Sequence, residues 1–115
     1  MARVVILRSF FWTALAFTFV MAVLPHPPRV PGLPSDKTQH VLAFMTLSVL
    51  GTLAFRHLSF LRLFVPLVLF GILIEGVQAI PALHRDADMT DILADMGAAL
   101  IAGLITRGLA NARSS

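Results

Sequence analysis

The chain has 115 residues, which is enough for a single domain. Hydrophobic residues make up 57% of it and charged residues only 13%, where soluble domains carry roughly 25% charged residues. A soluble fold of this size could not bury so much apolar surface, so we expect a membrane protein. The absence of cysteine excludes disulfides, thiolate metal ligands and a cysteine nucleophile.

Four apolar runs follow one another along the chain, at about 6–24, 38–55, 63–80 and 89–106. Each is close to the ~17–25 residues that a membrane-spanning helix needs. The remaining ends and loops are too short for a soluble domain. We therefore predict an all-α fold, an integral membrane four-helix bundle in which residues 1–115 form one domain.

The breaks between the runs carry residues that end or begin helices. A proline-rich stretch at 25–34 ends the first helix, and Pro81 ends the third. Ser35 or Asp36 can cap the second helix, and Asp88 lies where the fourth begins, at the end of a helix dipole that favours carboxylates.

The basic residues indicate how the bundle is oriented. If the chain crosses four times, six arginines fall on the side of the termini and three basic residues fall on the other side. The six are Arg3, Arg8, Arg56, Arg62, Arg107 and Arg113, and the three are Arg29, Lys37 and Arg85. The positive-inside rule then places both termini in the cytoplasm. Because the basic residues are scattered singly between apolar runs, the net charge of +3 reflects membrane orientation and not a nucleic-acid partner.

Ionisable and amide side chains recur at similar depth in three of the four predicted helices. His40 follows Asp36 by one helical turn, Gln78 follows Glu75 by three residues, and Asp88, Asp91 and Asp95 form one stripe. A charged group facing lipid there costs on the order of 2–3 kcal/mol. We therefore expect these groups to face one another in an outward-open polar pocket, with Arg85 and Lys37 as counter-charges. The alternative is that they only join helices by hydrogen bonds.

Several functions fit such a pocket. In an enzyme, His40 would be the general base, with Glu75 or Asp91 as its orienting or acid partner. The substrate-binding residues would then be Asp36, Lys37, Gln78, Arg85, Asp88 and Asp95. A small proton-coupled transporter could relay protons through His40, Glu75 and Asp95. A metal site at these residues is a weaker alternative, and an accessory or structural membrane protein is a further one.

Three segments also resemble the VanZ-like family. Asp36-Lys37-Thr38-Gln39-His40 followed by Ala43-Phe44 looks like its first signature, Glu75, Gln78 and Pro81 look like its second, and Arg85, Asp88, Asp91 and Gly97 look like its third. The resemblance covers about 35–104 and departs at Asp95, where many relatives have asparagine.

The resemblance implies a multi-pass protein of the bacterial cell envelope, in a family linked to resistance to the glycopeptide teicoplanin. Some relatives are called acyltransferases. Together, residues and resemblance predict a protein of the bacterial inner membrane that binds or modifies an envelope lipid or cell-wall precursor. We expect membrane lipids and a lipid-linked cell-wall precursor as partners, and no nucleic acid, metal or other cofactor. The oligomeric state stays open.

Overall fold

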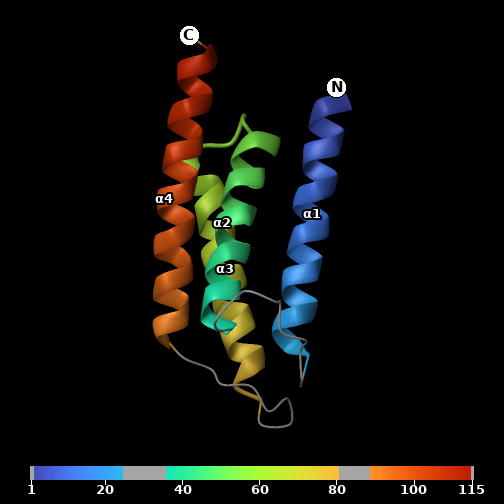
Figure 1. Ribbon diagram of the computed structural model, residues 1–115, viewed down its shortest axis with the longest axis vertical. Coiled ribbons are helices and arrows are strands. Elements are labelled where there is room, and N and C mark those ends of the chain that lie inside the picture. Colours follow the sequence, from blue (N-terminus) through green and yellow to red (C-terminus); the bar gives the residue numbers. More distant parts are fainter. Residues whose placement is uncertain (1, 25–35, 81–88, 115) are drawn as a thin grey trace.

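The computed structural model describes residues 2–24, 36–80 and 89–114, and these form four helices. The helices are α1 (Ala2–Val23), α2 (Asp36–Ala54), α3 (Phe60–Gln78) and α4 (Met89–Ser114). Successive helices run in opposite directions along the bundle, so both termini and the α2–α3 turn lie at one end (Figure 1). The predicted all-α, four-helix architecture is thus confirmed.

The helix bounds differ from the apolar runs mainly where arginines lie. α1 already begins at Ala2 and includes Arg3, and α4 continues to Ser114 past Arg107 and Arg113. Arginine forms helices well, so the backbone stays helical after the apolar run has ended. An apolar run therefore marks the segment that is apolar enough for lipid contact. The helix itself extends beyond this segment.

The third helix is capped at both ends. The Ser59 hydroxyl accepts a hydrogen bond from the backbone N–H of Arg62, and the N–H of Ala79 donates to the carbonyl of Glu75. Pro66 lies inside the helix and has no N–H, so the carbonyl of Arg62 loses its usual intrahelical donor.

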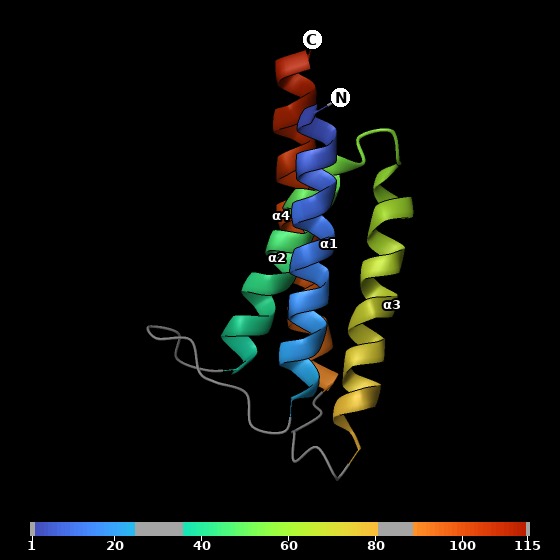
Figure 2. The same cartoon turned by 90° about the vertical axis from the view of Figure 1, so that its right-hand side faces the viewer.

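Three of the helices are long and apolar enough to cross a membrane: Ala2–Val23, Phe60–Gln78 and the Ile92–Arg113 part of α4. Within the described side chains, α2 has a shorter apolar segment, Gln39–Ala54. α2 shares the two most extensive helix contacts of the bundle, with α4 and with α1, and it also packs against α3 (Figure 2).

The outer surface of the bundle is apolar along its length. Leu93 is 73% exposed, Phe17 and Leu109 are each 63% exposed and Leu69 is 60% exposed. Large contiguous apolar surfaces of this kind are rare on soluble monomers and mark contact with a membrane or another protein.

Two apolar clusters fill the interior at different heights. Cluster A, nearer the α1–α2 and α3–α4 connections, joins all four helices through Ala22, Phe44, Ile74 and Ala99. Cluster B, nearer the termini, joins α1, α2 and α3 through Phe11, Leu47 and Leu67. The phenylalanines of the two clusters meet through Phe70, which packs against both.

The closest approach of α2 and α4 depends on small side chains. Ser48 donates a 2.7 Å hydrogen bond to the carbonyl of Ala99, and Ala99 is fully buried. A Cβ added to Gly103 would lie 2.6 Å from the Ser48 hydroxyl and 3.1 Å from the Phe60 ring. The small residues of α4 thus serve packing inside the bundle.

Gly103→Ala should lower the stability of the bundle relative to Gly108→Ala. Both changes add the same methyl group to α4, but a Cβ at Gly108 meets nothing within 4 Å. Both gain helix propensity, and only Gly103→Ala displaces the Ser48 hydroxyl from its bond to Ala99. We expect a difference of about 1–3 kcal/mol in unfolding free energy, the usual cost of overpacking. Unfolding in mixed micelles followed by circular dichroism measures it, and equal stability would contradict the close approach.

Candidate functional site

A layer of polar side chains lies one helical turn beyond cluster A. His40 precedes Phe44 by four residues, Asp95 precedes Ala99 by four, and Gln78 follows Ile74 by four. Residues four apart share a helix face. Since Phe44, Ala99 and Ile74 meet in one cluster, the faces of α2, α4 and α3 that carry the three polar residues point toward the bundle interior.

Helix direction places these residues on the same side of the cluster. α2 and α4 begin at this end and α3 finishes at it (Figure 1), so each polar residue lies ~6 Å from its apolar partner toward the connections at 25–35 and 81–88. Glu75 lies one residue beyond Ile74 and three before Gln78, at the boundary between cluster A and this layer. We call His40, Glu75, Gln78 and Asp95 the polar layer, and cluster A forms its apolar floor.

The polar layer is largely sealed from the outside of the bundle. Gln78 is 2% exposed, Asp95 is 3% exposed and Glu75 is 8% exposed, while His40 is half-buried. Two buried carboxyl groups on different helices are uncommon, because burial of ionisable groups is costly. The structure therefore places Glu75, Gln78 and Asp95 inside the bundle and not on its outer face.

Gln78 joins the polar layer to the first helix. Its amide Nε2 donates a 2.9 Å hydrogen bond to the carbonyl of Ala22, in the last turn of α1. Within the described residues, the buried Oε1 of the same amide has no hydrogen-bond donor. Gln78 thus both ties α3 to α1 and presents an acceptor in the polar layer.

The other predicted site residues are described only in part or not at all. Asp36 and Lys37 lie in the first turn of α2, and Asp91 lies in the first turn of α4, but their side chains fall outside the described part of the structure. Arg85 and Asp88 lie outside the described residues altogether. Among the side chains that are described, no three histidine or acidic groups are placed to hold a metal ion.

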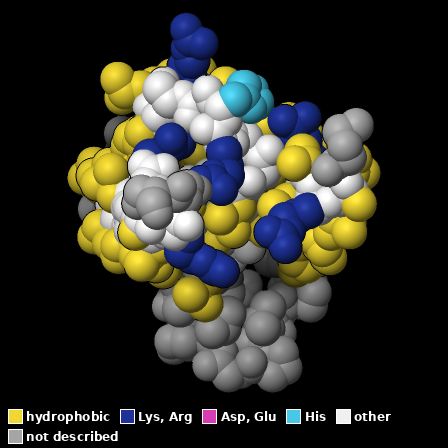
Figure 3. All heavy atoms as spheres, turned by 90° about the horizontal axis from the view of Figure 1, so that it is seen from above, with side chains coloured by type: hydrophobic (Ala, Val, Ile, Leu, Met, Phe, Trp, Pro, Cys, Tyr) yellow, Lys and Arg dark blue, Asp and Glu magenta, His cyan; other side chains and the backbone are white. Residues whose placement is uncertain are grey.

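Arginines gather at the opposite end of the bundle. Arg3 and Arg8 lie near the start of α1, Arg56 and Arg62 flank the α2–α3 turn, and Arg107 lies in the last turns of α4. Figure 3 looks onto this end and shows dark blue side chains distributed over it. The two described carboxyl groups, Glu75 and Asp95, belong to the polar layer at the far end.

Several of these arginines also hold helices together, which the sequence did not reveal. Arg8 Nε donates to the carbonyl of Ala54 at 3.1 Å, and its guanidinium lies 4.8 Å from the centre of the Phe55 ring. Arg107 Nη2 donates to the carbonyl of Leu58 at 3.1 Å. These carbonyls belong to the end of α2 and the following turn, where no further helical N–H can reach them. The signal in the sequence that could have indicated this role is the position of these arginines beside predicted helix ends.

The comparisons with known proteins give no match for this chain. No family model, curated protein or solved structure matches it.

Gln78→Leu should loosen the contact between α1 and α3. The substitution keeps a side chain of similar size in the buried position but removes the donor to the Ala22 carbonyl. A side-chain hydrogen bond between membrane helices contributes about 0.6 kcal/mol on average and up to about 1.7, and we expect a loss in that range. Ser9→Ala, which removes an exposed bond within α1, is the control. The unfolding free energy in micelles is the measurement, and a stability loss no larger than that of the control would contradict the inter-helix role.

Proposed function

We propose that the chain is a VanZ-like multi-pass protein of the bacterial inner membrane, whose polar layer binds or modifies an envelope lipid or lipid-linked cell-wall precursor from the outer face. The observation that carries the proposal is the burial of Glu75 and Asp95 on two helices, in one layer, inside a bundle whose outside is apolar. Such residues in membrane bundles commonly mark substrate or ion pathways.

Insertion in a bilayer is supported by the distribution of apolar side chains. Each of the three long apolar helices buries only 11–28% of its most apolar segment within the bundle. A helix of 22 residues such as α1 is about 33 Å long, close to the ~30 Å of a bilayer's hydrocarbon core. Hydrocarbon is the environment that accepts these exposed side chains without aggregation.

The orientation follows from the arginine-bearing end. Both termini and the α2–α3 turn lie there (Figure 1), and arginines are retained on the cytoplasmic side of membranes. The polar layer then lies beneath the outer surface, where envelope precursors are used.

The chemistry of the layer favours a charged or hydrogen-bonding headgroup as ligand. His40 is the general base of the proposed site, with Glu75 or Asp91 orienting it. Arg85 and Lys37 neutralise a phosphate or carboxylate of the ligand. The amide oxygen of Gln78 accepts a hydrogen bond from a ligand hydroxyl or amide.

Single cysteines test the orientation, because the chain has no cysteine of its own. Cysteine at Gly32 or Ala82 should react with an impermeant thiol reagent in intact cells. His57→Cys, in the exposed turn between α2 and α3, should react only after the membrane is permeabilised. Protection of both outer positions with labelling at 57 would reverse the orientation and refute an outward-facing site.

Glu75→Gln tests the site itself. The change preserves the shape of the side chain and removes its capacity to ionise. The full chain in lipid nanodiscs is titrated with a purified lipid-linked peptidoglycan precursor, and binding is read from the change in its fluorescent label. We expect at least about tenfold weaker binding, since a hydrogen bond to a charged group contributes about 1.5–3 kcal/mol.

His57→Ala is the matched control for His40→Ala, because His57 is exposed in the α2–α3 turn at the other end of the bundle. Binding should fall with His40→Ala and stay at the parental level with His57→Ala. If the folded Glu75→Gln protein binds like the parent, the polar layer serves only to hold helices together and the proposed function is refuted.

A further inference from the structure

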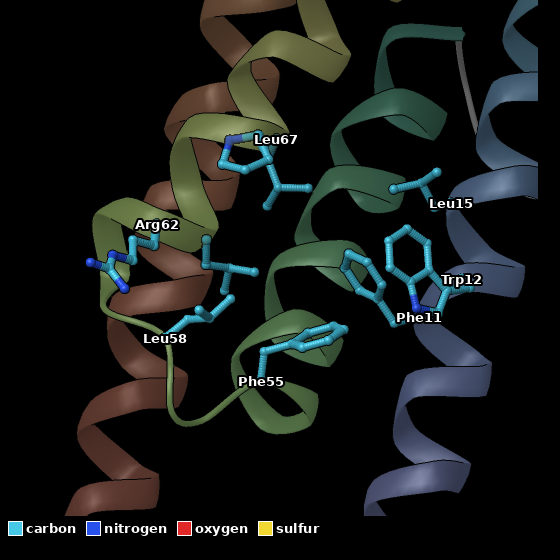
Figure 4. A pocket seen from close by; sticks show the side chains of 9 residues that line it. Phe11, Trp12, Leu15, Phe55, Leu58, Arg62 and Leu67 are labelled. Atoms are coloured by element: carbon cyan, nitrogen blue, oxygen red, sulfur yellow. The ribbon is translucent and has the colours of Figure 1, made fainter.

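An apolar groove runs between α1 and α3 in the half of the bundle that carries the arginines, away from the polar layer. Its volume is about 220 Å³. The α1 wall is formed by Phe11, Trp12 and Leu15, and Phe55 and Leu58 close the end near the α2–α3 turn (Figure 4). The groove is thus open along the surface of the bundle that we place in lipid.

The α3 wall combines apolar side chains with one cation. Leu63 and Leu67 are 6% and 2% exposed and form the floor, while Pro66 and Arg62 are exposed at the edge. Among the residues that line the groove, Arg62 carries the formal charge. A groove lined in this way fits a hydrocarbon chain that ends near a cation.

A second depression lies on the other side of Arg62. It is more open, and it is lined by Leu58, Leu61, Arg62, Val65 and Pro66. Arg62, Leu58 and Pro66 belong to both hollows. One guanidinium therefore lies between two adjoining apolar surfaces.

The guanidinium of Arg62 differs from those of its neighbours. Arg8, Arg56 and Arg107 each donate to a backbone carbonyl of another segment. Within the described part of the chain, the Arg62 side chain forms no hydrogen bond or ion pair; only its backbone N–H is engaged, by Ser59. Its planar set of donors is suited to a phosphate and is available for one.

We propose that this groove is a binding site for one anionic glycerophospholipid, with its phosphate on Arg62 and its two acyl chains in the two hollows. The inference rests on the membrane placement and orientation given above, which put Arg62 at the inner leaflet, and it is independent of any activity of the polar layer. A second copy of the chain would cover the groove as well, but it would not account for a guanidinium without a carboxylate partner between two hydrocarbon surfaces.

Trp12 makes the site directly measurable. It is the only tryptophan of the sequence, it lines the groove, and it packs edge-on against Phe11 with ring centres 5.1 Å apart. Lipids with brominated acyl chains quench tryptophan on contact. The full chain is reconstituted in phosphatidylcholine vesicles containing a small fraction of brominated phosphatidylglycerol or, separately, brominated phosphatidylcholine.

We expect brominated phosphatidylglycerol to quench Trp12 at about fivefold lower mole fraction than brominated phosphatidylcholine, the factor that one basic residue provides at a membrane surface. Arg62→Gln should abolish this preference. Arg113→Gln removes the same charge from the end of α4, away from the groove, and should retain it. Leu15→Phe, which fills the groove wall, should weaken quenching by both lipids.

Each of the following results would overturn the site. If the preference for brominated phosphatidylglycerol survived Arg62→Gln, Arg62 would not be its cause. If the preference fell equally with Arg113→Gln, it would reflect the total positive charge of this end of the bundle and not a site at Arg62. Equal quenching by the two lipids would show that no headgroup is selected. Weak quenching by both, with Trp12 emission still typical of an apolar environment, would show that a second copy covers the groove. Water-like emission without quenching would instead refute the membrane placement, and with it the proposed function.

Discussion

Ser48 and Gly103 lie where α2 and α4 come closest, and the rest of the bundle is arranged around this contact. α2 and α4 pack against each other more extensively than any other pair of helices, and the 2.7 Å bond from Ser48 to the Ala99 carbonyl fixes their register. In hydrocarbon, helices gain little from burying apolar surface against each other, so association depends on close van der Waals contact and hydrogen bonds. Small residues on one face of α4 make both possible.

The register of α2 and α4 determines which side chains face the interior of the bundle at each level. With Phe44 opposite Ala99 in cluster A, the next turn toward the helix starts brings His40 and Asp95 inward together. α3 completes this layer with Glu75 and Gln78 and attaches α1 through the bond from Gln78 to Ala22. Moving α4 along α2 by one turn would separate His40 and Asp95 by ~5 Å along the bundle axis, so that they would no longer lie in one layer.

The two ends are also held in different ways. At the polar layer, which contains the buried carboxyl groups of Glu75 and Asp95, the side-chain amide of Gln78 joins α3 to α1. At the opposite end, long arginine side chains reach backbone carbonyls, as Arg8 does at Ala54 and Arg107 does at Leu58. These arginines thereby close helix ends. Arg62, whose side chain has no such role in the described residues, is the one that lies between the two apolar hollows.

Much of this architecture follows from the sequence alone. Runs of apolar residues of spanning length, separated by proline-rich or arginine-rich breaks, determine four helices, because hydrocarbon permits no unpaired backbone. Helical periodicity likewise determined that His40, Glu75, Gln78 and Asp95 would avoid the outer surface, since the cost of exposing them to lipid does not depend on which neighbours they find.

Only the tertiary structure decided which helix makes the most extensive contacts, how far each helix extends and where the groove is. α2 makes the most extensive contacts, with α4 and α1, because its small residues let the neighbouring helices approach closely. α4 extends to Ser114, because arginines continue a helix that hydropathy ends. The groove between α1 and α3 depends on residues far apart in the chain, such as Trp12 and Arg62. Their proximity results from the packing of the helices, which no local pattern of the sequence specifies.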